Sequence, residues 1–250
     1  MRKCVGIATA LAGLLAMSID ARAADLPVAP APVYVPPPFT FTGFYIGANI
    51  GGSWNIDHWS ESAFGSVFGT QNSGGRFIGG GQVGFNYQFG PLVVGAEADG
   101  DWGANSQNAG NAAFIAPVGN IIVLANRTWV STAAARVGFA ADHLLFYVKG
   151  GGGWAGNNGY TLSNTTTGAT ISGLGSGTNS GWLIGGGLEW AVTDHWTVKF
   201  EYDYVRLSNY SFVVPPTAAF LAGDTFTNSG PGLMMAKVGV NYLFNWGGGY

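Results

Sequence analysis

The sequence predicts an all-β fold: an eight-stranded antiparallel up-and-down transmembrane β-barrel with short periplasmic turns and long extracellular loops. Three observations predict it. Apolar residues recur at every second position in eight separate segments, as in strands with one apolar face. The connections between these segments alternate between tight turns and long polar stretches. Charged residues make up only 9% of the 250-residue chain, aromatic residues make up 14%, and 42 residues are glycine.

The closing segment, residues 234–244, shows the alternation most clearly. Apolar side chains occupy every second position, and residues such as Lys237 and Asn241 fall between them. An apolar face of this kind packs against a second sheet in a soluble sandwich or faces lipid in a membrane barrel. The last two outward residues, Tyr242 and Phe244, are aromatic, as in the girdle at a membrane interface.

Seven further segments show the same pattern, with an apolar or aromatic face that alternates with small or polar residues. These segments are residues 43–54, 76–89, 92–102, 128–139, 144–154, 181–192 and 196–204. An even number of strands places both ends of the barrel on one side of the membrane. We expect the first segment to pair with the last, because an open edge in lipid would leave backbone groups unsatisfied.

The connections decide between the sandwich and the membrane barrel. Tight turns are expected at residues 90–91, 140–143 and 193–195. The other connections are each longer than 20 residues and rich in Gly, Asn, Ser and Thr: residues 55–75, 103–127, 155–180 and 205–231. Compact soluble domains rarely contain such long connections. Short turns at one end and long loops at the other favour an outer-membrane barrel.

The first 23 residues are expected to be a signal peptide. Arg2 and Lys3 precede an apolar stretch that is too short to span a bilayer. Residues 21–23 form a small-residue cleavage site, so we expect Sec-type cleavage near Ala23. That cleavage would remove Cys4, the single cysteine of the chain, and with it any disulfide or thiolate site.

The rest of the chain then divides into two predicted parts. Residues 24–39 are rich in proline and are expected to form an extended, semi-rigid periplasmic leader. Residues 40–250 are expected to form the barrel domain, in the outer membrane of a Gram-negative cell.

The inward-facing parity collects most of the charged residues outside the signal peptide. These are Glu97, Asp99, Asp101, Arg136, Lys149, Glu189, Lys199, Glu201, Asp203 and Lys237. The interior of an eight-stranded barrel is just wide enough for side chains to fill it. We therefore expect opposite charges to pair in the lumen and stabilise the barrel. The alternative is a narrow or gated water path.

Evidence for catalysis is weak. His58 lies beside Asp57 and near Glu61 in the first predicted loop, and an Asp-His pair can activate a nucleophile or water. His143 and His195 each follow an aspartate in a predicted periplasmic turn, where hydrogen bonding of Asp to the turn backbone is the simpler explanation. We predict that the protein is not an enzyme.

The sequence also predicts no cofactor, no metal and no nucleic-acid partner. It contains no metal-ligand spacing. The glycines of residues 79–84 partly match a dinucleotide fingerprint, but they lie within a predicted strand and no helix follows. A formal charge of −3 and the lack of a basic run exclude the electrostatic footprint of a nucleic-acid-binding protein.

Several stretches resemble a known family. They are Ala24-Asp25-Leu26-Pro27, the segment Phe41-Thr42-Gly43-Phe44-Tyr45-Ile46-Gly47, and the closing residues 237–244. With them the chain resembles the small porin-like outer-membrane β-barrel proteins of alphaproteobacteria, often called outer-membrane immunogenic proteins. The closing segment is similar to the assembly signal of such barrels, carried here by Lys237, Gly239, Tyr242 and Phe244. The chain continues to Tyr250, whereas many relatives stop at the terminal Phe of that strand.

The pattern as a whole indicates an integral outer-membrane surface protein with a structural, envelope-integrity and surface-interaction role. Its expected partners are outer-membrane lipid, lipopolysaccharide, the barrel-assembly machinery, peptidoglycan and neighbouring barrels. The predicted loops carry apolar side chains for such contacts, namely Phe64, Phe68, Phe114, Ile115, Phe212 and Phe220. The first alternative is a narrow porin-like channel for small solutes. The second is an outer-membrane lipid-modifying enzyme.

Overall fold

The computed structural model describes residues 39–72, 75–103, 113–115, 118–216 and 221–245. The chain divides into two units, Met1–Pro36 and Pro37–Tyr250, and every described residue belongs to the second. The predicted signal peptide and all of the predicted leader except Phe39 therefore lie outside the described residues. No helix in the described part of the chain is long and apolar enough to cross a bilayer.

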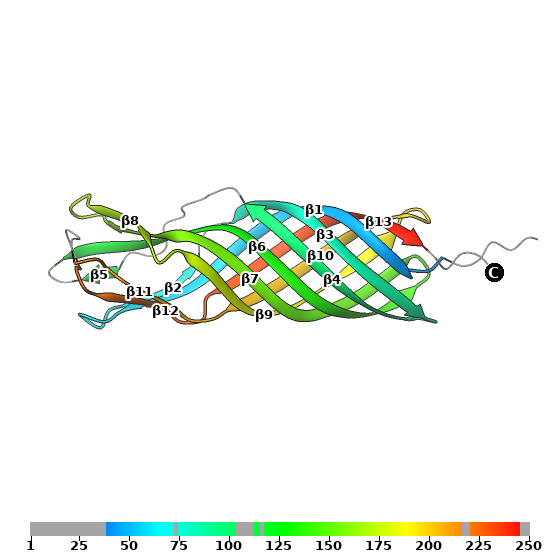
Figure 1. Cartoon of the computed structure of the whole chain (residues 1–250), viewed down its shortest axis with the longest axis horizontal. Coiled ribbons are helices and arrows are strands. Elements are labelled where there is room, and N and C mark those ends of the chain that lie inside the picture. Colours follow the sequence, from blue (N-terminus) through cyan, green and yellow to red (C-terminus); the bar gives the residue numbers. More distant parts are fainter. Residues whose placement is uncertain (1–38, 73–74, 104–112, 116–117, 217–220, 246–250) are drawn as a thin grey trace, which may run out of the picture. The chain divides into compact units, whose positions relative to one another are not determined.

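Eight strands close into a barrel (Figure 1). They are β1 (Gly43–Glu61), β3 (Arg76–Phe89), β4 (Leu92–Gly103), β6 (Gly119–Ala141), β7 (Leu144–Asn164), β9 (Gly177–Ala191), β10 (Trp196–Leu207) and β13 (Gly232–Asn245). Each pairs antiparallel with the next, and β1 pairs with both β3 and β13. The closing seam runs from Phe44 opposite Phe244 to Trp54 opposite Met234. The predicted fold and its closure are confirmed.

One end of the barrel carries only short connections, and we call it the turn end. Gly90 and Pro91 join β3 to β4, and Asp142 and His143 join β6 to β7. Gly90 has a φ of 58° and Asp142 a φ of 54°, values that only small or turn-forming residues adopt readily. Residues 192–195 join β9 to β10. These turns lie where the sequence predicts them.

The other end carries the long connections that the sequence predicts, and parts of them form additional sheet. Here β1 and β7 continue past residues 54 and 154, β6 begins before residue 128, and all three pair with short additional strands. The additional strands are β2 (Val67–Asn72), β5 (Ala113–Ile115), β8 (Thr170–Leu174), β11 (Tyr210–Val213) and β12 (Thr225–Asn228). We call this whole part the extension. It is ordered as sheet because it buries an apolar interior of its own. The polar composition of these stretches does not reveal that interior in the sequence.

The outward face of the barrel is an apolar band between two aromatic girdles. The girdle near the turn end contains Phe44, Tyr87, Phe89, Phe139, Phe146, Trp190, Trp196 and Phe244. The girdle next to the extension contains Trp54, Phe77, Trp102, Trp154 and Trp182. Exposed aliphatic side chains such as Ile50, Val148 and Ile184 lie between them. This arrangement is that of a strand barrel in a lipid bilayer.

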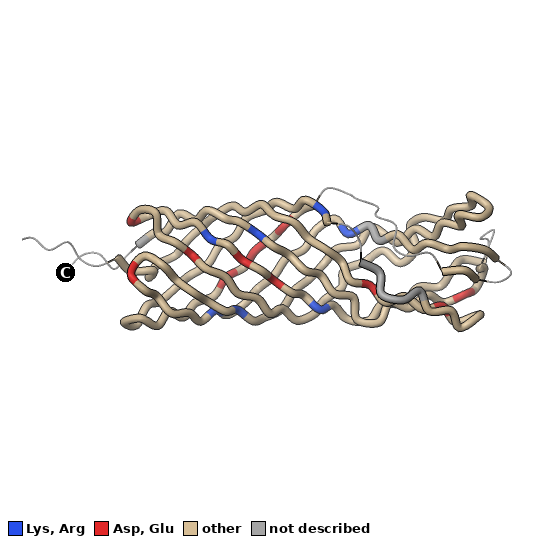
Figure 2. Tube along the Cα trace, turned by 180° about the vertical axis from the view of Figure 1, so that it is seen from behind, with Lys and Arg blue, Asp and Glu red and all other residues tan. Residues whose placement is uncertain are grey.

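Buried side chains fill the interior in successive layers. An inner apolar layer lies at the turn end and contains Phe41, Val93, Ala140, Leu145, Tyr147 and Ala191. The charged residues follow, and Figure 2 shows them gathered along the barrel. An outer apolar layer comes next and contains Ile78, Val130, Ala134, Ala155, Leu183, Val205, Leu207, Leu233 and Met235. The extension holds a third apolar cluster: Trp59, Ile115, Ile121, Val123, Tyr160, Leu162, Leu174, Phe212, Val214, Leu221 and Phe226.

Candidate functional site

The site is the charged interior of the barrel between the two apolar layers. All ten residues that parity places inside are buried there, and each takes part in at least one ion pair. Alternation along the strands is the cause. Arg136 on β6, for example, is buried, whereas its neighbours Ala135 and Val137 face outward. We call these ten residues the lumen network.

Arg136 is the most completely surrounded member of the lumen network. Its guanidinium nitrogens lie 3.5 Å from Glu97 and 3.0 Å from Glu189. Its Nε donates a 2.7 Å hydrogen bond to Asn86. The rings of Tyr45 and Tyr147 lie 4.8 Å and 4.9 Å from the guanidinium carbon. Because this position offers a partner on every side of a planar cation, it suits Arg better than Lys.

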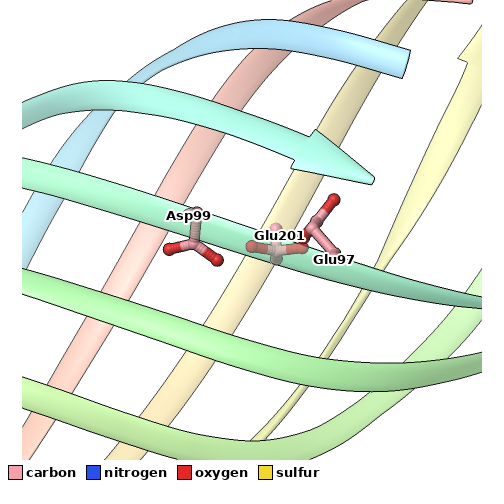
Figure 3. A group of neighbouring side chains, drawn as sticks. All are labelled: Glu97, Asp99 and Glu201. Carbon is pink, nitrogen blue, oxygen red and sulfur yellow. The ribbon is translucent and has the colours of Figure 1, made fainter. Parts of the chain in front are cut away.

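Lys149 holds a group of carboxylates that otherwise has the geometry of a metal site. Figure 3 shows Glu97, Asp99 and Glu201 facing one another in the interior, and one oxygen from each lies within 4.8 Å of the others. The Lys149 ammonium lies 3.3 Å, 3.4 Å and 2.8 Å from oxygens of these three residues. It also lies 3.2 Å from Asp203. The ammonium therefore supplies the positive charge that a metal would bring.

Two further lysines complete the ionic contacts. Lys199 lies 2.9 Å from Glu97 and 3.4 Å from Glu201. Lys237 contacts four carboxylates at 2.9–3.4 Å, namely Asp99, Asp101, Glu201 and Asp203. Each ammonium bridges several acids, so no single ion pair is isolated from the rest.

Six carboxylates of the lumen network face only four cations, and neutral donors add hydrogen bonds to four of these carboxylates. The hydrogen bonds run from Tyr45 to Glu97 (2.8 Å), Tyr147 to Glu201 (2.7 Å), Thr132 to Asp99 (2.6 Å), Thr197 to Glu189 (2.5 Å) and Asn241 to Glu189 (3.0 Å). These neutral residues were not among those predicted for the lumen, because only charged residues were assigned to it. Their signal was the same inward parity that located the charged ones.

Inward glycines make room for these long side chains. A Cβ added at Gly84 would collide with the Tyr45 hydroxyl, and one added at Gly185 would collide with an Asp203 oxygen. The glycine-rich strands of this chain therefore fit a narrow interior crowded with large polar groups.

A second polar contact, which sequence reasoning missed, lies beyond the outer apolar layer. Arg127 lies 3.2 Å from Asp57 and donates a 2.7 Å hydrogen bond to Asn55. Asn228 donates a 2.8 Å hydrogen bond to the same Asp57 oxygen. Residues 55–75 and 103–127 were predicted as loops, so parity was not applied to them.

The three histidines lie outside the lumen network. Asp57 and His58 are neighbours on β1, and Asp57 is buried toward Arg127 whereas His58 is exposed on the opposite face. His143 lies 2.9 Å from Asp142 within its own turn, and the ring of His195 lies 3.2 Å from a backbone carbonyl oxygen. The side chains of Asp57 and His58 therefore lie on opposite faces of β1 and do not face a common site.

The four residues of the predicted assembly signal lie on β13. Lys237 and Gly239 are buried toward the interior, and Tyr242 and Phe244 are on the outward face. The two rings pack edge to face with centroids 4.9 Å apart. Tyr250 lies outside the described residues. The assembly role stays a prediction.

The predicted loop contacts need one correction. Ile115 and Phe212 are buried in the extension cluster and are not available at its surface. Phe64 and Phe114 are exposed, whereas Phe220 and the side chain of Phe68 lie outside the described residues. Strand pairing is the reason, because it turns alternate side chains of β5 and β11 inward.

A closed antiparallel barrel with a lipid-facing band between aromatic girdles and a filled polar interior is an outer-membrane β-barrel protein. Residues 9–244 match the family described as outer membrane protein beta-barrel domain, and the chain belongs to this family. The family resemblance and the outer-membrane location predicted from the sequence are confirmed.

Two outer-membrane immunogenic proteins of Brucella are similar to this chain along most of its length. The chain is 32% identical over 250 residues to the 31 kDa outer-membrane immunogenic protein of Brucella melitensis biotype 1, covering 94% of this chain and 98% of that protein. It is 28% identical over 250 residues to the 25 kDa outer-membrane immunogenic protein of Brucella canis, covering 98% and 100%. Among solved structures, OprG of Pseudomonas aeruginosa aligns with a TM-score of 0.47 and 13% identity, covering 81% and 97%.

Proposed function

We propose that this protein is a sealed, non-enzymatic barrel that supports the integrity of the outer membrane and presents its extension outside the cell. The observation that carries the proposal is the filled interior. The lumen network lies between two apolar layers, and the extension adds a third apolar cluster beyond them. A solute that crossed the barrel would have to displace all of these layers.

The energetics of the lumen network oppose such a displacement. Each Lys or Arg in it contacts at least two carboxylates, and the side chains of Lys149, Lys199 and Lys237 are fully buried. Removing one partner of a buried ion pair costs about 3–5 kcal/mol, because the other charge is left uncompensated. A transient opening would strand several charges at once. This cost supports a structural role over a channel.

The extension supports the second half of the proposal. It is a folded, water-exposed sheet that continues beyond the outer girdle, on the side where such barrels carry their longer segments. Its surface exposes Phe64 and Phe114 among polar residues. We propose lipopolysaccharide and neighbouring barrels as its contacts, with the assembly machinery recognising β13 from the other side.

Conductance measurements test the sealed interior. Purified protein in a planar lipid bilayer is expected to show no steady open level, while an open porin in the same bilayer provides the positive control. Lys149→Ala combined with Glu201→Ala removes an ion pair and is expected to raise the conductance. Arg206→Ala, which changes an exposed cation, is the matched control and is expected to have no effect. A large, steady wild-type conductance would establish the solute channel instead.

Envelope assays test the physiological half. A deletion strain is expected to become more sensitive to detergent, and the wild-type gene is expected to restore resistance. A His58→Ala gene is expected to restore it equally well and to leave lipid deacylation by the purified protein unchanged from the wild-type background. Deacylation by wild-type protein that His58→Ala abolishes would contradict the non-enzymatic assignment.

A further inference from the structure

A layer of polar groups separates the outer apolar layer from the extension cluster, and we call it the arginine layer. Its members are Asp57, Arg76, Arg127, Asn157 and the hydroxyl group of Tyr160. Along β6, Arg127 lies between Val130 of the outer apolar layer and Val123 of the extension cluster. Arg127 is 2% exposed, and its cross-strand partner Asn157 is 8% exposed. Apart from the half-buried Arg76, the arginine layer is therefore shielded from water.

The arginine layer contains two positive charges and one carboxylate. Arg127 lies 3.2 Å from Asp57. Arg76 donates a 2.5 Å hydrogen bond to the backbone carbonyl oxygen of Arg127, and the positive charges of the two arginines repel each other. Within the described ranges, Arg76 itself forms no ion pair. The arginine layer therefore carries one positive charge in excess.

No other part of the barrel sequence can supply the missing negative charge. The stretches between residues 40 and 245 that lie outside the described residues contain no Asp or Glu: residues 73–74, 104–112, 116–117 and 217–220. The acids of the lumen network are paired with its own cations on the other side of the outer apolar layer. The excess charge of the arginine layer is therefore not balanced from within the barrel.

Three buried hydrogen-bond donors in the arginine layer have no acceptor among the described residues. They are Arg76 Nε, Asn157 Nδ2 and the Tyr160 hydroxyl. The orientation of the Asn157 amide is fixed, because its Oδ1 atom accepts a 3.0 Å hydrogen bond from the N–H of Gly159. Its Nδ2 atom must therefore donate elsewhere. A buried donor without an acceptor is costly, so three of them in one layer require an explanation.

All three donors adjoin Arg127. The Tyr160 hydroxyl lies beside the Arg127 guanidinium, Asn157 is opposite Arg127 across the strands, and Arg76 is bonded to the Arg127 carbonyl oxygen. The missing component is thus an acceptor that also carries negative charge. A water molecule would accept the hydrogen bonds but would leave the positive charge uncompensated in a shielded layer. A small anion satisfies both requirements, since hydrogen bonds to an ionised acceptor are the strong ones.

We propose that the arginine layer binds one chloride ion, which accepts hydrogen bonds from Arg76, Asn157 and Tyr160. A monatomic anion fits single N–H and O–H donors that approach from different strands inside a closed barrel. The ion links β3 of the barrel to the part of β7 that enters the extension. Because the folded extension binds the ion and the unfolded chain does not, chloride outside the cell stabilises the extension.

Bromide tests the site, because its anomalous X-ray scattering distinguishes it from water. Crystals of the whole protein soaked in sodium bromide are expected to show an anomalous peak within hydrogen-bonding distance of Asn157 Nδ2 and the Tyr160 hydroxyl. In detergent solution, chloride and bromide are expected to protect the extension from proteolysis relative to gluconate at equal ionic strength. The protection should be saturable, with half-saturation below the physiological ionic strength of about 0.15 M.

Two substitutions separate anion binding from a purely structural role. Tyr160→Phe keeps the ring and removes one donor, and it is expected to weaken bromide binding at least about tenfold. Asn157→Asp places a carboxylate beside Arg127, and it is expected to protect the extension without halide and to abolish the halide response. Asn158→Asp, at the next residue on the exposed face of β7, is the matched control and is expected to respond to halide as wild type does.

Three results would overturn the proposal. They are a water without anomalous signal in the arginine layer at saturating bromide, equal protection of wild type in halide and gluconate, and an unchanged halide response in Asn157→Asp. A bromide peak without protection in solution would mark an adventitious ion only and would also contradict the proposal. Electrophoretic mobility before and after boiling shows whether each variant still forms the barrel. None of these results affects the sealed-barrel assignment, because the arginine layer lies outside the lumen network.

Discussion

The barrel and the extension are built from some of the same strands, yet their polarity is reversed. At the level of the apolar band, β7 turns Lys149 inward and Val148 outward. Further along the same strand, in the extension, Leu162 is fully buried and Asn158 is exposed. The strand geometry is the same in both regions, so the surroundings decide which side chains each face requires.

Lipid and water account for the reversal. In the apolar band the outside is hydrocarbon, so apolar residues face outward and polar residues must satisfy one another inside. In the extension the outside is water, so burial of apolar surface inside stabilises the sheet, as in a soluble protein. Between its two apolar layers, the interior of the barrel is therefore held by ion pairs and hydrogen bonds, whereas the apolar cluster of the extension is held by packing.

The largest expected effect on stability comes from removing a charge of the lumen network. Arg136→Ala removes a cation that contacts Glu97 and Glu189. It is expected to destabilise the barrel by about 3–5 kcal/mol, because the buried Glu189 carboxylate loses its one ion-pair partner among the described residues, whereas Glu97 keeps Lys149 and Lys199. Arg206→Ala, on the exposed side of β10, is the control and is expected to cost less than about 0.5 kcal/mol. Urea unfolding in detergent measures both, and equal midpoints would refute an ion-paired interior.

A substitution in the apolar cluster of the extension is expected to cost a similar free energy of unfolding, but only in the extension. Phe226→Ala removes a fully buried ring from the extension cluster and is expected to cost about 3–5 kcal/mol of extension stability. Limited proteolysis should then cut the extension while the barrel keeps its compact mobility before boiling. Phe114→Ala, at a ring that is 68% exposed, is the matched control. Simultaneous loss of the barrel would show that the two regions unfold together.

These two halves were not equally predictable from the sequence. The barrel strands were, because apolar residues on their lipid-facing side alternate with the charged residues of the lumen network. The extension was not, because its alternation changes phase. On β7 the buried positions pass from odd residues such as Ala155 to even ones such as Leu162 where the register with β6 shifts, near Gly159. Gly159 has a φ of 109°, which an L side chain rarely adopts.

The turn-like composition of the predicted loops explains what was missed in the polar interior. Parity found the ten charges of the lumen network but not the pair formed by Arg127 and Asp57, since both lie in stretches that read as loops. The Gly, Asn, Ser and Thr content of those stretches is typical of turns. Their buried residues, such as Trp59 and Tyr160, lie too far apart in the sequence to reveal that they share a cluster.

The smallest expected effect is a pH dependence confined to the extension. Burial raises the pKa of the Tyr160 phenol to about 12, whereas an unfolded tyrosine titrates near 10. Between these values the unfolded chain releases a proton that the folded chain keeps. The contribution of Tyr160 is therefore complete below pH 10 and is lost as the pH rises toward 12. Protease protection of the extension should fall less steeply over this range in Tyr160→Phe, and identical slopes would contradict the assignment.

The most direct test compares the cost of a lysine on the outward face of the barrel with its cost on the outward face of the extension. Val148 on β7 and Val213 on β11 are 60% and 59% exposed, so they differ in surroundings rather than in accessibility. We expect Val148→Lys to destabilise the folded protein by about 2–4 kcal/mol, since a lysine there faces hydrocarbon. Val213→Lys faces water and is expected to change the stability by less than about 0.5 kcal/mol. Urea unfolding in lipid vesicles measures the difference. A large cost for the first variant alone is the predicted result, and equal costs would contradict the reversed polarity of the two regions.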